Sequence, residues 1–419
     1  MESSSPLENK SKPRRRRKPK SICLPFAAEA YQRGLDDHVY CRQYIMELYE
    51  RFPELFPAAL SEGFTFHGFL SSKKQDLIQR RIQLKANDEQ YQIRPSFMMP
   101  YMIGPTAEVE KALYYRRWGV PFAALPHAFG HTPMYWYRAY VALGRFSLVG
   151  TTIKDPDRLP THLLADEKHT RHQGNKAYIP TTVAQECILG AEVVESPGEE
   201  ELKKGYRVFR QEARNLDPDY CPDTVNTDGW DATQNVWKTL FPRILILPCF
   251  LHFVLKIKNR CRSDKDLLHT LQDKIWSGYH AETRASFAQR LRRLREWVAP
   301  RQMATTVKEK VLDLCAHAAD FKKAFDHPGA YRTSNALDRL MDYQDRLLYT
   351  MQYFHGTLES AGLFVRAMAL VWNFHPYGQK TQKKYGPRAS PFQQLNGFSY
   401  HDSWLENMMI AASLNGQRA

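Results

Sequence analysis

The sequence predicts an α/β protein with a mixed central sheet, helices on its faces and a helical insertion within the sheet domain. Two observations carry this prediction. Between residues 160 and 250, apolar segments of strand length alternate with amphipathic segments of helix length. The stretch that follows, residues 256–323, has helical periodicity throughout and is strongly basic.

Six parts are expected along the chain. They are a basic arm (1–24), a helical region (25–155), the first part of the sheet domain (156–255), the helical insertion (256–330), the last helices of the sheet domain (331–380) and a C-terminal tail (381–419). A chain of 419 residues with 43% hydrophobic residues can build at least one proper core, so a wholly disordered protein is excluded.

The charge balance indicates a polyanionic partner. Lysine and arginine number 59 against 45 acids, a net charge of +14. Neutralising phosphates releases counterions and contributes much of the affinity of nucleic-acid-binding proteins, so we expect DNA as the partner.

Cysteine usage and hydropathy indicate the compartment. The seven cysteines are scattered, odd in number and never two residues apart, which argues against a disulfide framework and favours a reducing environment. The longest apolar run, 244–255, contains Pro248 and is too short to cross a membrane, and the start of the chain has no secretory signal. We expect a soluble, intracellular protein without a membrane partner, located in the cytoplasm or nucleoid if the source is bacterial.

The N-terminal arm carries eight basic residues and two acids within residues 1–20, a net charge of +6. Such a segment does not fold alone. One interpretation is a solvated tail; the other is an arm along DNA phosphates, or a nuclear localisation signal in a eukaryotic host. The residues expected to contact DNA are Arg14, Arg15, Arg16 and Arg17.

Three helical patterns precede the sheet domain, at residues 108–118, 120–129 and 134–143. Thr132 is placed to cap the last of them, with Pro133 at its first position. A Gly-containing turn between two short helices is typical of a helix-turn-helix, although any small helical bundle has such turns. On the DNA-binding interpretation, Tyr135 and Arg138 of the last helix point towards DNA. Residues 25–100 have short helical patterns to which we assign no role.

The sheet domain is predicted from seven segments. Strands are expected at 163–168, 177–184, 187–194, 224–227 and 243–247, with helices at 199–215 and 232–240. The first three strands form the simplest antiparallel meander, and the later ones are joined through helices. This order of elements is that of an RNase H-like fold.

The insertion is the second candidate DNA contact. Residues 256–323 carry 16 Lys and Arg against 8 Asp and Glu, a net charge of +8. Arg292 and Arg293 lie in the arginine-rich run at its middle, where guanidinium groups on the solvent face of a helix can pair with phosphates. The alternative is a helix that is merely well solvated.

Two acids end strands of the expected sheet. Asp166 closes the first strand at its exposed end, and Asp228 closes the fourth, 62 residues later. In this fold those strands are neighbours, so the two carboxylates are expected to meet. Carboxylates are the ligands that Mg²⁺ prefers, and two such ions can clamp the attacking and leaving oxygens of a phosphoryl transfer. We expect two Mg²⁺ or Mn²⁺ ions here, with both acids catalytic.

A third acid is expected on the helix after the insertion. Asp338, Asp342 and Asp345 share one face of it. Asp338 is favoured as the third metal ligand because it lies in the first turn, where anions are tolerated. Glu359 is the reserve choice.

Cys249 and His252 lie three residues apart, on one face of a helix that starts after the last strand. A zinc site normally has four ligands, and no second pair at usable spacing is present. His252 is therefore expected to support the site, as a hydrogen-bonding residue or a general acid or base. The alternative is a buried cysteine beside a core histidine.

Together these residues resemble the transposases with an acidic DDE or DDD triad, particularly the bacterial insertion-sequence and Mutator-like groups that carry a Cys-x-x-His pair. The matching segments are 164–167, 227–229, 249–252 and 333–339, and the likeness spans about 160–375. The resemblance implies that Asp166, Asp228 and Asp338 bind the metal ions and that the helix-turn-helix binds terminal inverted repeats. The chain departs at the third position, where the family mostly has Glu.

The function implied by this resemblance is DNA transposition: strand cleavage at transposon ends, then strand transfer of the freed 3′ hydroxyl to target DNA, by a homo-oligomer on DNA. Two alternatives stay open. One is a domesticated transposase that keeps the fold but acts only as a sequence-specific DNA-binding protein; the other is an RNase H-like nuclease that never rejoins DNA.

Overall fold

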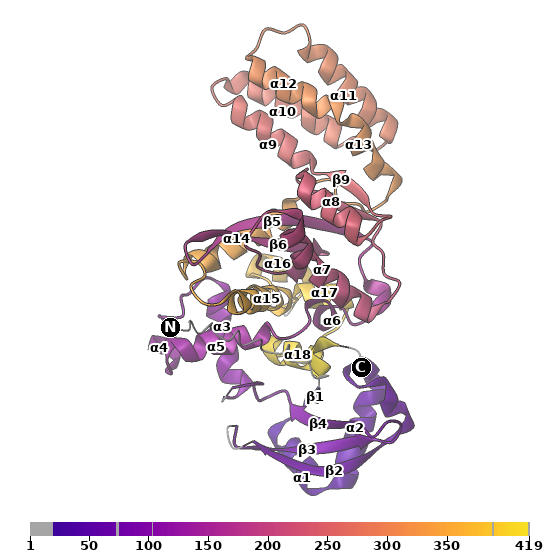
Figure 1. The fold of residues 1–419 in the computed structure, drawn as a ribbon, viewed down its shortest axis with the longest axis vertical. Coiled ribbons are helices and arrows are strands. Elements are labelled where there is room, and N and C mark those ends of the chain that lie inside the picture. Colours follow the sequence, from indigo (N-terminus) through magenta and orange to yellow (C-terminus); the bar gives the residue numbers. More distant parts are fainter. Residues whose placement is uncertain (1–19, 73–74, 103, 388, 418–419) are drawn as a thin grey trace, which may run out of the picture.

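The protein is described here by a computed structural model covering residues 20–72, 75–102, 104–387 and 389–417. It is an α/β protein with two sheets, so the predicted class is confirmed at that level. Figure 1 shows three parts along the longest axis: a four-stranded sheet at one end, a five-stranded sheet with its helices in the middle, and a helical insertion at the other end. No helix in these described ranges is long and apolar enough to span a membrane.

The N-terminal sheet is a correction to the expected helical region. Its strands, in the order β1-β4-β3-β2, are β1 (Ser21–Leu24), β2 (Phe64–Ser72), β3 (Leu77–Leu84) and β4 (Gln90–Pro95), with helices α1 (Ala28–Asp36) and α2 (His38–Arg51). Buried side chains alternate with more exposed ones, as at Ile82 and Leu84 in β3 and at Tyr91 and Ile93 in β4. This two-residue period is typical of a half-buried strand. The prediction of a helical region was wrong here because this period is not the helical one.

The next helices follow the predicted segments more closely. They are α3 (Thr106–Arg117), α4 (Leu125–Phe129), α5 (Pro133–Leu143) and α6 (Leu148–Thr152). The Thr132 side chain accepts a hydrogen bond from the Tyr135 amide at 3.2 Å and so caps α5, as predicted. The expected helix from Val120 is shorter and begins only at Leu125, because Pro121 disfavours helical backbone at the residue before it.

The five-stranded sheet has the order β7-β6-β5-β8-β9. Its strands are β5 (His162–His172), β6 (Asn175–Ala184), β7 (Cys187–Ala191), β8 (Thr224–Thr227) and β9 (Leu245–Pro248). The first three form an antiparallel meander, whereas β5, β8 and β9 are parallel, so the predicted mixed sheet is present. Parallel neighbours require crossovers, which α7 (Glu199–Leu216) and α8 (Asp231–Leu240) supply.

The sheet is covered on both faces. Leu163 and Ala165 of β5 belong to the cluster built with α7 and α8, whereas Leu164 between them belongs to the cluster built with α14 (Asn335–Tyr349) and α15 (Leu358–Phe374). Alternate side chains of a strand point to opposite faces. Asp166 therefore shares the α14 face with Leu164, and Glu167 shares the α7–α8 face.

The insertion is helical, as predicted, and has a hydrophobic core of its own. Its helices are α9 (Phe250–Arg260), α10 (Lys265–Tyr279), α11 (Arg284–Val298), α12 (Thr305–Ala316) and α13 (Ala318–Lys322). Its two connections to the sheet meet, because the Phe250 amide donates to the Arg332 carbonyl at 3.0 Å. The insertion thus begins and ends at the same place on the sheet domain.

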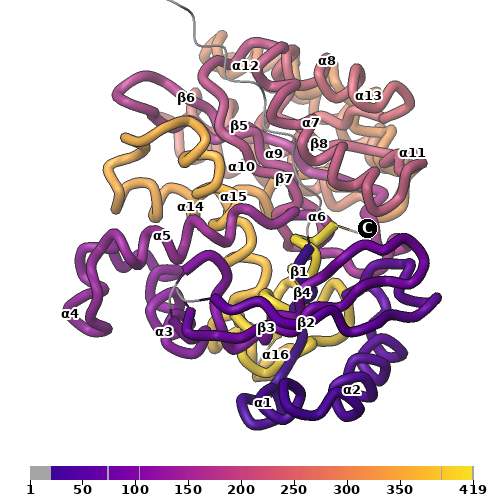
Figure 2. The backbone as a smooth tube through the Cα atoms, turned by 60° about the horizontal axis from the view of Figure 1, so that its bottom comes forward, coloured from indigo at the N-terminus to yellow at the C-terminus, as the bar shows by residue number. Residues whose placement is uncertain are grey.

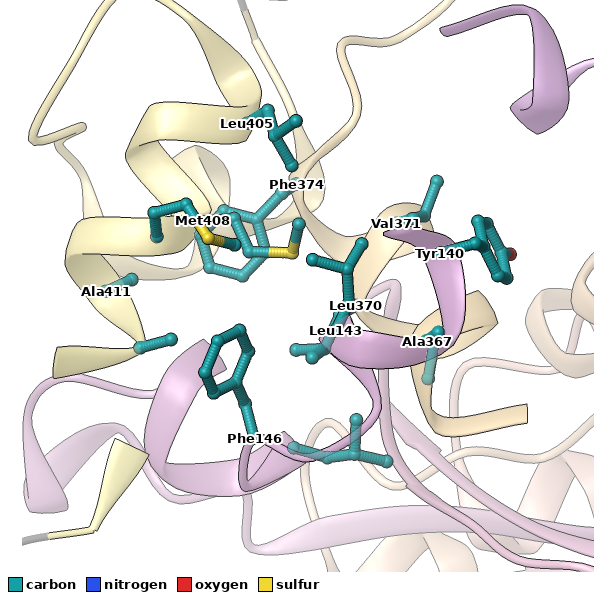
Figure 3. Close-up of a cluster of buried hydrophobic side chains, with 14 of the residues drawn as sticks. Tyr140, Leu143, Phe146, Ala367, Leu370, Val371, Phe374, Leu405, Met408 and Ala411 are labelled. Atoms are coloured by element: carbon teal, nitrogen blue, oxygen red, sulfur yellow. The ribbon is translucent and has the colours of Figure 1, made fainter. Parts of the chain in front are cut away.

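The C-terminal segment is not the tail that was expected. It forms α16 (Gln379–Tyr385), α17 (Pro391–Asn396) and α18 (Trp404–Ala411), and α18 is almost wholly buried. In Figure 3, Leu405 and Met408 of α18 meet Phe374 of α15 in one apolar cluster. Figure 2 shows this yellow end of the chain beside β1, where the Cys23 amide donates to the Ser413 hydroxyl at 3.1 Å. The last residues therefore join the N-terminal sheet to the rest of the molecule.

Candidate active site

Asp166 and Asp228 come together through the pairing of β5 with β8. These strands are parallel neighbours, and their last paired residues are Leu164 and Asn226. Continuing that register by two residues brings Asp166 level with Asp228 on the same face of the sheet. After Asp228 the chain turns at Gly229 (φ +95°), and the Asp228 carboxylate accepts a hydrogen bond from the Trp230 amide at 2.9 Å.

The position of Asp166 within its strand corrects one expectation. Asp166 is not at the end of β5, since the strand continues to His172 and Asp166 itself pairs with Thr181 of β6. The reason is that β5 is longer than its neighbour: β8 stops near residue 227, whereas the β5–β6 hairpin projects further. Asp166 is consequently half-buried where the parallel part of the sheet ends.

Asp338 reaches the same place from α14, the helix after the insertion. This helix lies along β5, held by an ion pair between Asp345 and Lys168. Asp338 lies in its first turn, as expected, and is half-buried, whereas Asp342 and Asp345 are exposed. Of the three acids on this helix, Asp338 is the one that the fold brings to Asp166.

Cys249 and His252 complete the cluster at the start of α9. Cys249 Sγ accepts a hydrogen bond from the Ser334 amide at 3.3 Å, and the Ser334 hydroxyl donates to the Asp338 carboxylate at 3.4 Å. Both residues therefore lie where the chain leaves and re-enters the insertion. Ser334 was not singled out from the sequence, and its only signal was its place before an acid-bearing helix.

Like charges at this site oppose one another. The pKa of the Asp166 carboxyl is raised to about 6, mainly by burial and then by the charges of Asp228 and, less strongly, Asp338. The hydrogen bond from the Glu167 amide and the charge of His252 act in the opposite direction. Burial likewise raises the pKa of Asp338, again opposed by His252. The three carboxylates and the imidazole are thus close enough to sense one another's charge.

His252 is the cation of this cluster. Its hydrogen bond to Cys249 raises its pKa to about 9, against the effect of burial, and Asp166 and Asp228 add to the rise. For Cys249, burial opposes ionisation, but the hydrogen bond and charge of His252 outweigh it and the pKa of the thiol is lowered. Both shifts favour a charged imidazole at this position, beside the acids.

Glu167 is a site residue that the sequence did not single out. It is 6% exposed, and one carboxyl oxygen accepts from the Tyr206 hydroxyl at 2.7 Å and from Thr233 Oγ1 at 2.6 Å. Burial raises its pKa to about 7, against the effect of these two hydrogen bonds. Because it binds one side chain from α7 and one from α8, it fixes both helices to the strand beside Asp166.

The remaining predicted residues lie elsewhere. Glu359 is exposed at the start of α15, and its neighbour Ser360 contacts Tyr137 of α5 at 2.9 Å, so the reserve ligand is at a different place. Tyr135 and Arg138 of α5 line an open groove of about 640 Å³. Arg292 and Arg293 are exposed on α11. The arginines Arg14, Arg15, Arg16 and Arg17 lie outside the described residues.

The donor chemistry of the cluster fits a hard divalent cation, because it consists of carboxylates that repel one another. The side chains of the cluster are not close enough together to form a complete set of metal ligands. Among the residues that the structure describes, no three His, Cys, Asp or Glu side chains lie close enough to hold a metal ion. Binding an ion would draw the carboxylates together. No model of a known protein family matches the chain, and a search of curated proteins finds no similar sequence.

Proposed function

We propose that the protein is a DNA transposase, a metal-dependent polynucleotidyl transferase that cleaves DNA at transposon ends and joins the freed 3′ ends to target DNA. The observation that carries the proposal is the convergence of three acids from distant parts of the chain. The β5–β8 register brings Asp166 level with Asp228, and α14 adds Asp338 on the same face. All three acids are half-buried, although unpaired carboxylates are usually exposed.

The order of elements supports an RNase H-like fold for this domain. An antiparallel meander is followed by a helix, a parallel strand, a second helix and a second parallel strand, with the meander's first strand at the centre of the sheet. Asp228 follows the carboxyl end of β8, and Asp166 lies in β5 just past its parallel pairing with β8. Ligands bind near the carboxyl ends of parallel strands in open α/β sheets.

Asp166, Asp228 and Asp338 are the residues that would hold Mg²⁺ or Mn²⁺. The bound ions supply Lewis acidity and a water of lowered pKa for attack on phosphorus. Asp166 is mostly ionised at neutral pH despite its raised pKa of about 6, so it can act as a ligand there. His252 keeps a positive charge beside the acids, where it can hydrogen-bond a phosphate oxygen.

DNA as the substrate is supported by charge. The insertion carries the net charge of +8 close to the acids, because its two connections meet at Phe250 and Arg332. Arg292 and Arg293 on α11 and Arg138 on α5 are exposed, and Tyr135 beside Arg138 is half-buried. Exposed arginines suit contact with phosphates. A homo-oligomer would be needed to hold two transposon ends at once.

The test is a cleavage and joining assay with Mg²⁺ on DNA carrying the sequences that flank the coding region. Substituting Asp166→Asn, Asp228→Asn or Asp338→Asn should lower the rate on the order of 10³-fold, because a lost metal ligand removes several kcal/mol of transition-state stabilisation. Asp342→Asn, one turn further along α14 and exposed, is the matched control and should keep the rate.

Other results of this assay would support a different function or a different set of metal ligands. Full activity of both Asp166→Asn and Asp228→Asn refutes the metal assignment. Loss of activity in Glu359→Gln but not in Asp338→Asn reassigns the third ligand. Cleavage without joining indicates a nuclease, and sequence-specific binding without cleavage by the wild type indicates a DNA-binding protein that has lost its chemistry.

A further inference from the structure

A second site lies next to the acids, on the other side of α14. Asp338 belongs to the carboxylate cluster, and the following residue, Arg339, lines a pocket of about 270 Å³. The pocket is enclosed by the end of α3, the end of α15, α16 and the turn between β6 and β7. Its aromatic and arginine side chains are Arg117, Trp118, Arg339, Trp372, Tyr377 and Tyr385.

The aromatic walls include rings that are open to a ligand. Trp118 is 45% exposed and Tyr385 is 47% exposed, although large aromatic side chains are usually buried. Trp372 is fixed in place, since its indole nitrogen donates to the Glu186 carbonyl at 2.8 Å. The pocket thus offers planar surfaces on more than one side.

The pocket is also positively charged. Arg117 lies 4.4 Å from the ring centres of both Tyr343 and Trp372, and its Nε has no hydrogen-bond partner among the described residues. Glu186 is the acid in the lining, and it is paired with Arg339 at 2.8 and 3.0 Å. The Arg117 guanidinium, held between these two rings, therefore adds a positive charge to the wall of the pocket, where Glu186 is paired with Arg339 instead.

The rim extends this charge along α16. Thr381 and Tyr385 of this helix line the pocket, and the exposed basic residues of the same helix are Lys380, Lys383 and Lys384. A flat aromatic slot with a basic rim suits a ligand that combines a planar ring with phosphates. A base stacked inside a duplex cannot present its face to such a slot, whereas an unpaired base can.

We propose that this pocket binds an unpaired nucleotide of the DNA strand that passes the carboxylates. Its base stacks on Trp118 and Tyr385, and its phosphates contact Arg117 and the lysines of α16. The proposal rests on the proposed function for the presence of DNA at Asp338, one residue away, but not on metal binding or cleavage. Such a site would recognise that a base is unpaired, whatever the base sequence.

The test measures binding of a fluorescein-labelled oligothymidine by fluorescence anisotropy, in EDTA so that no cleavage occurs. Trp118→Ala and Tyr385→Ala should each raise the Kd about tenfold, the size expected for one lost base–aromatic stack. Tyr349→Ala, which removes a tyrosine that is 77% exposed on α14 and outside the pocket, is the matched control. The Kd for a duplex of equal length should stay within about twofold in all variants.

Thermal melting monitored by circular dichroism verifies that the variants fold, which is expected because both side chains are exposed. An unchanged Kd for oligothymidine in both variants overturns the proposal, as does an equal loss of affinity for the duplex. Displacement of the oligonucleotide by free thymidine monophosphate at equal concentration also overturns it, in favour of a free-nucleotide site. Since no metal is present, these results are independent of the Asp166→Asn and Asp228→Asn assays that test the proposed function.

Discussion

The helical insertion and the five-stranded sheet bury their apolar side chains in different ways. The insertion packs five helices around one local core, made of residues from Phe250 to Phe321. The sheet buries its two faces against helices that come from both sides of the insertion in sequence, α7 and α8 before it and α14 and α15 after it. All five strands precede the insertion, but α14 and α15 can cover their face of the sheet only after the chain has returned from it.

Their charges differ as well. The insertion is basic, whereas the edge of the sheet beside it gathers three acids. Contacts within the insertion are enough to hold its basic side chains on the surface. The three acids repel one another, so contacts between distant segments are needed to hold them together. The candidate catalytic acids thus depend on contacts between distant parts of the chain, whereas Arg292 and Arg293 lie on a helix that packs within the insertion.

The largest expected effect comes from emptying either core. Phe287→Ala in the insertion and Trp237→Ala under the sheet each remove a fully buried ring, at a cost of about 3–5 kcal/mol. Hydrogen exchange should accelerate in α9–α13 for Phe287→Ala while the amides of β5 and β8 stay protected, and the reverse should hold for Trp237→Ala. Uniform acceleration by both variants would mean that the two regions unfold as one unit.

A smaller effect concerns the charge at the acids. The pKa of Asp166 is raised to about 6 from an ordinary value of 3.8, so its neutral form is favoured on folding. This contribution to stability is fully present below pH 4 and is lost as pH rises through 6. Without metal, Asp166→Asn should therefore be more stable than the wild type at pH 7.5, on the order of 2–3 kcal/mol, and equal to it at pH 4.

Adding Mn²⁺ should reverse that order at pH 7.5. The ion stabilises the wild type by binding its folded state, and the variant lacks one ligand. Thermal unfolding with EDTA and with Mn²⁺ measures both conditions. A wild type that Mn²⁺ leaves unchanged would argue against a metal site, whatever the pH dependence.

The smallest effect on stability is expected on the surface of the insertion. Replacing Arg292 and Arg293 together by alanine should change the free energy of unfolding by less than about 0.5 kcal/mol, because both are exposed. Binding to duplex DNA should weaken, and the slope of log K against log salt concentration should fall by about 2, since each phosphate contact contributes nearly one. An unchanged slope would place the DNA elsewhere.

Much of the fold around the acids could be predicted from local pattern. The strand at Thr224–Thr227 agrees residue for residue, and α7, α8 and the three strands of the meander lie where their periodicity indicated. The pairing of β5 with β8, which brings Asp166 to Asp228, followed from the order of these elements. The burial of Glu167 did not follow, because a neighbouring acid in a strand has no signal of its own until the helices that cover it are placed.

The sequence by itself determined most of the helices and strands in residues 160–375 and the neighbouring strands that bear Asp166 and Asp228, because periodicity and the order of elements are local or nearly local properties. The fold decided that Asp338, and not Glu359, lies beside them. Tertiary structure alone decided that α18 is core and not tail, that residues 64–95 form a sheet, and that aromatic side chains of α3, α15 and α16 enclose one pocket. The physical reason is that these outcomes depend on apolar contacts between segments far apart in the chain. The hydrophobic periodicity of one segment does not show which distant segment it will contact.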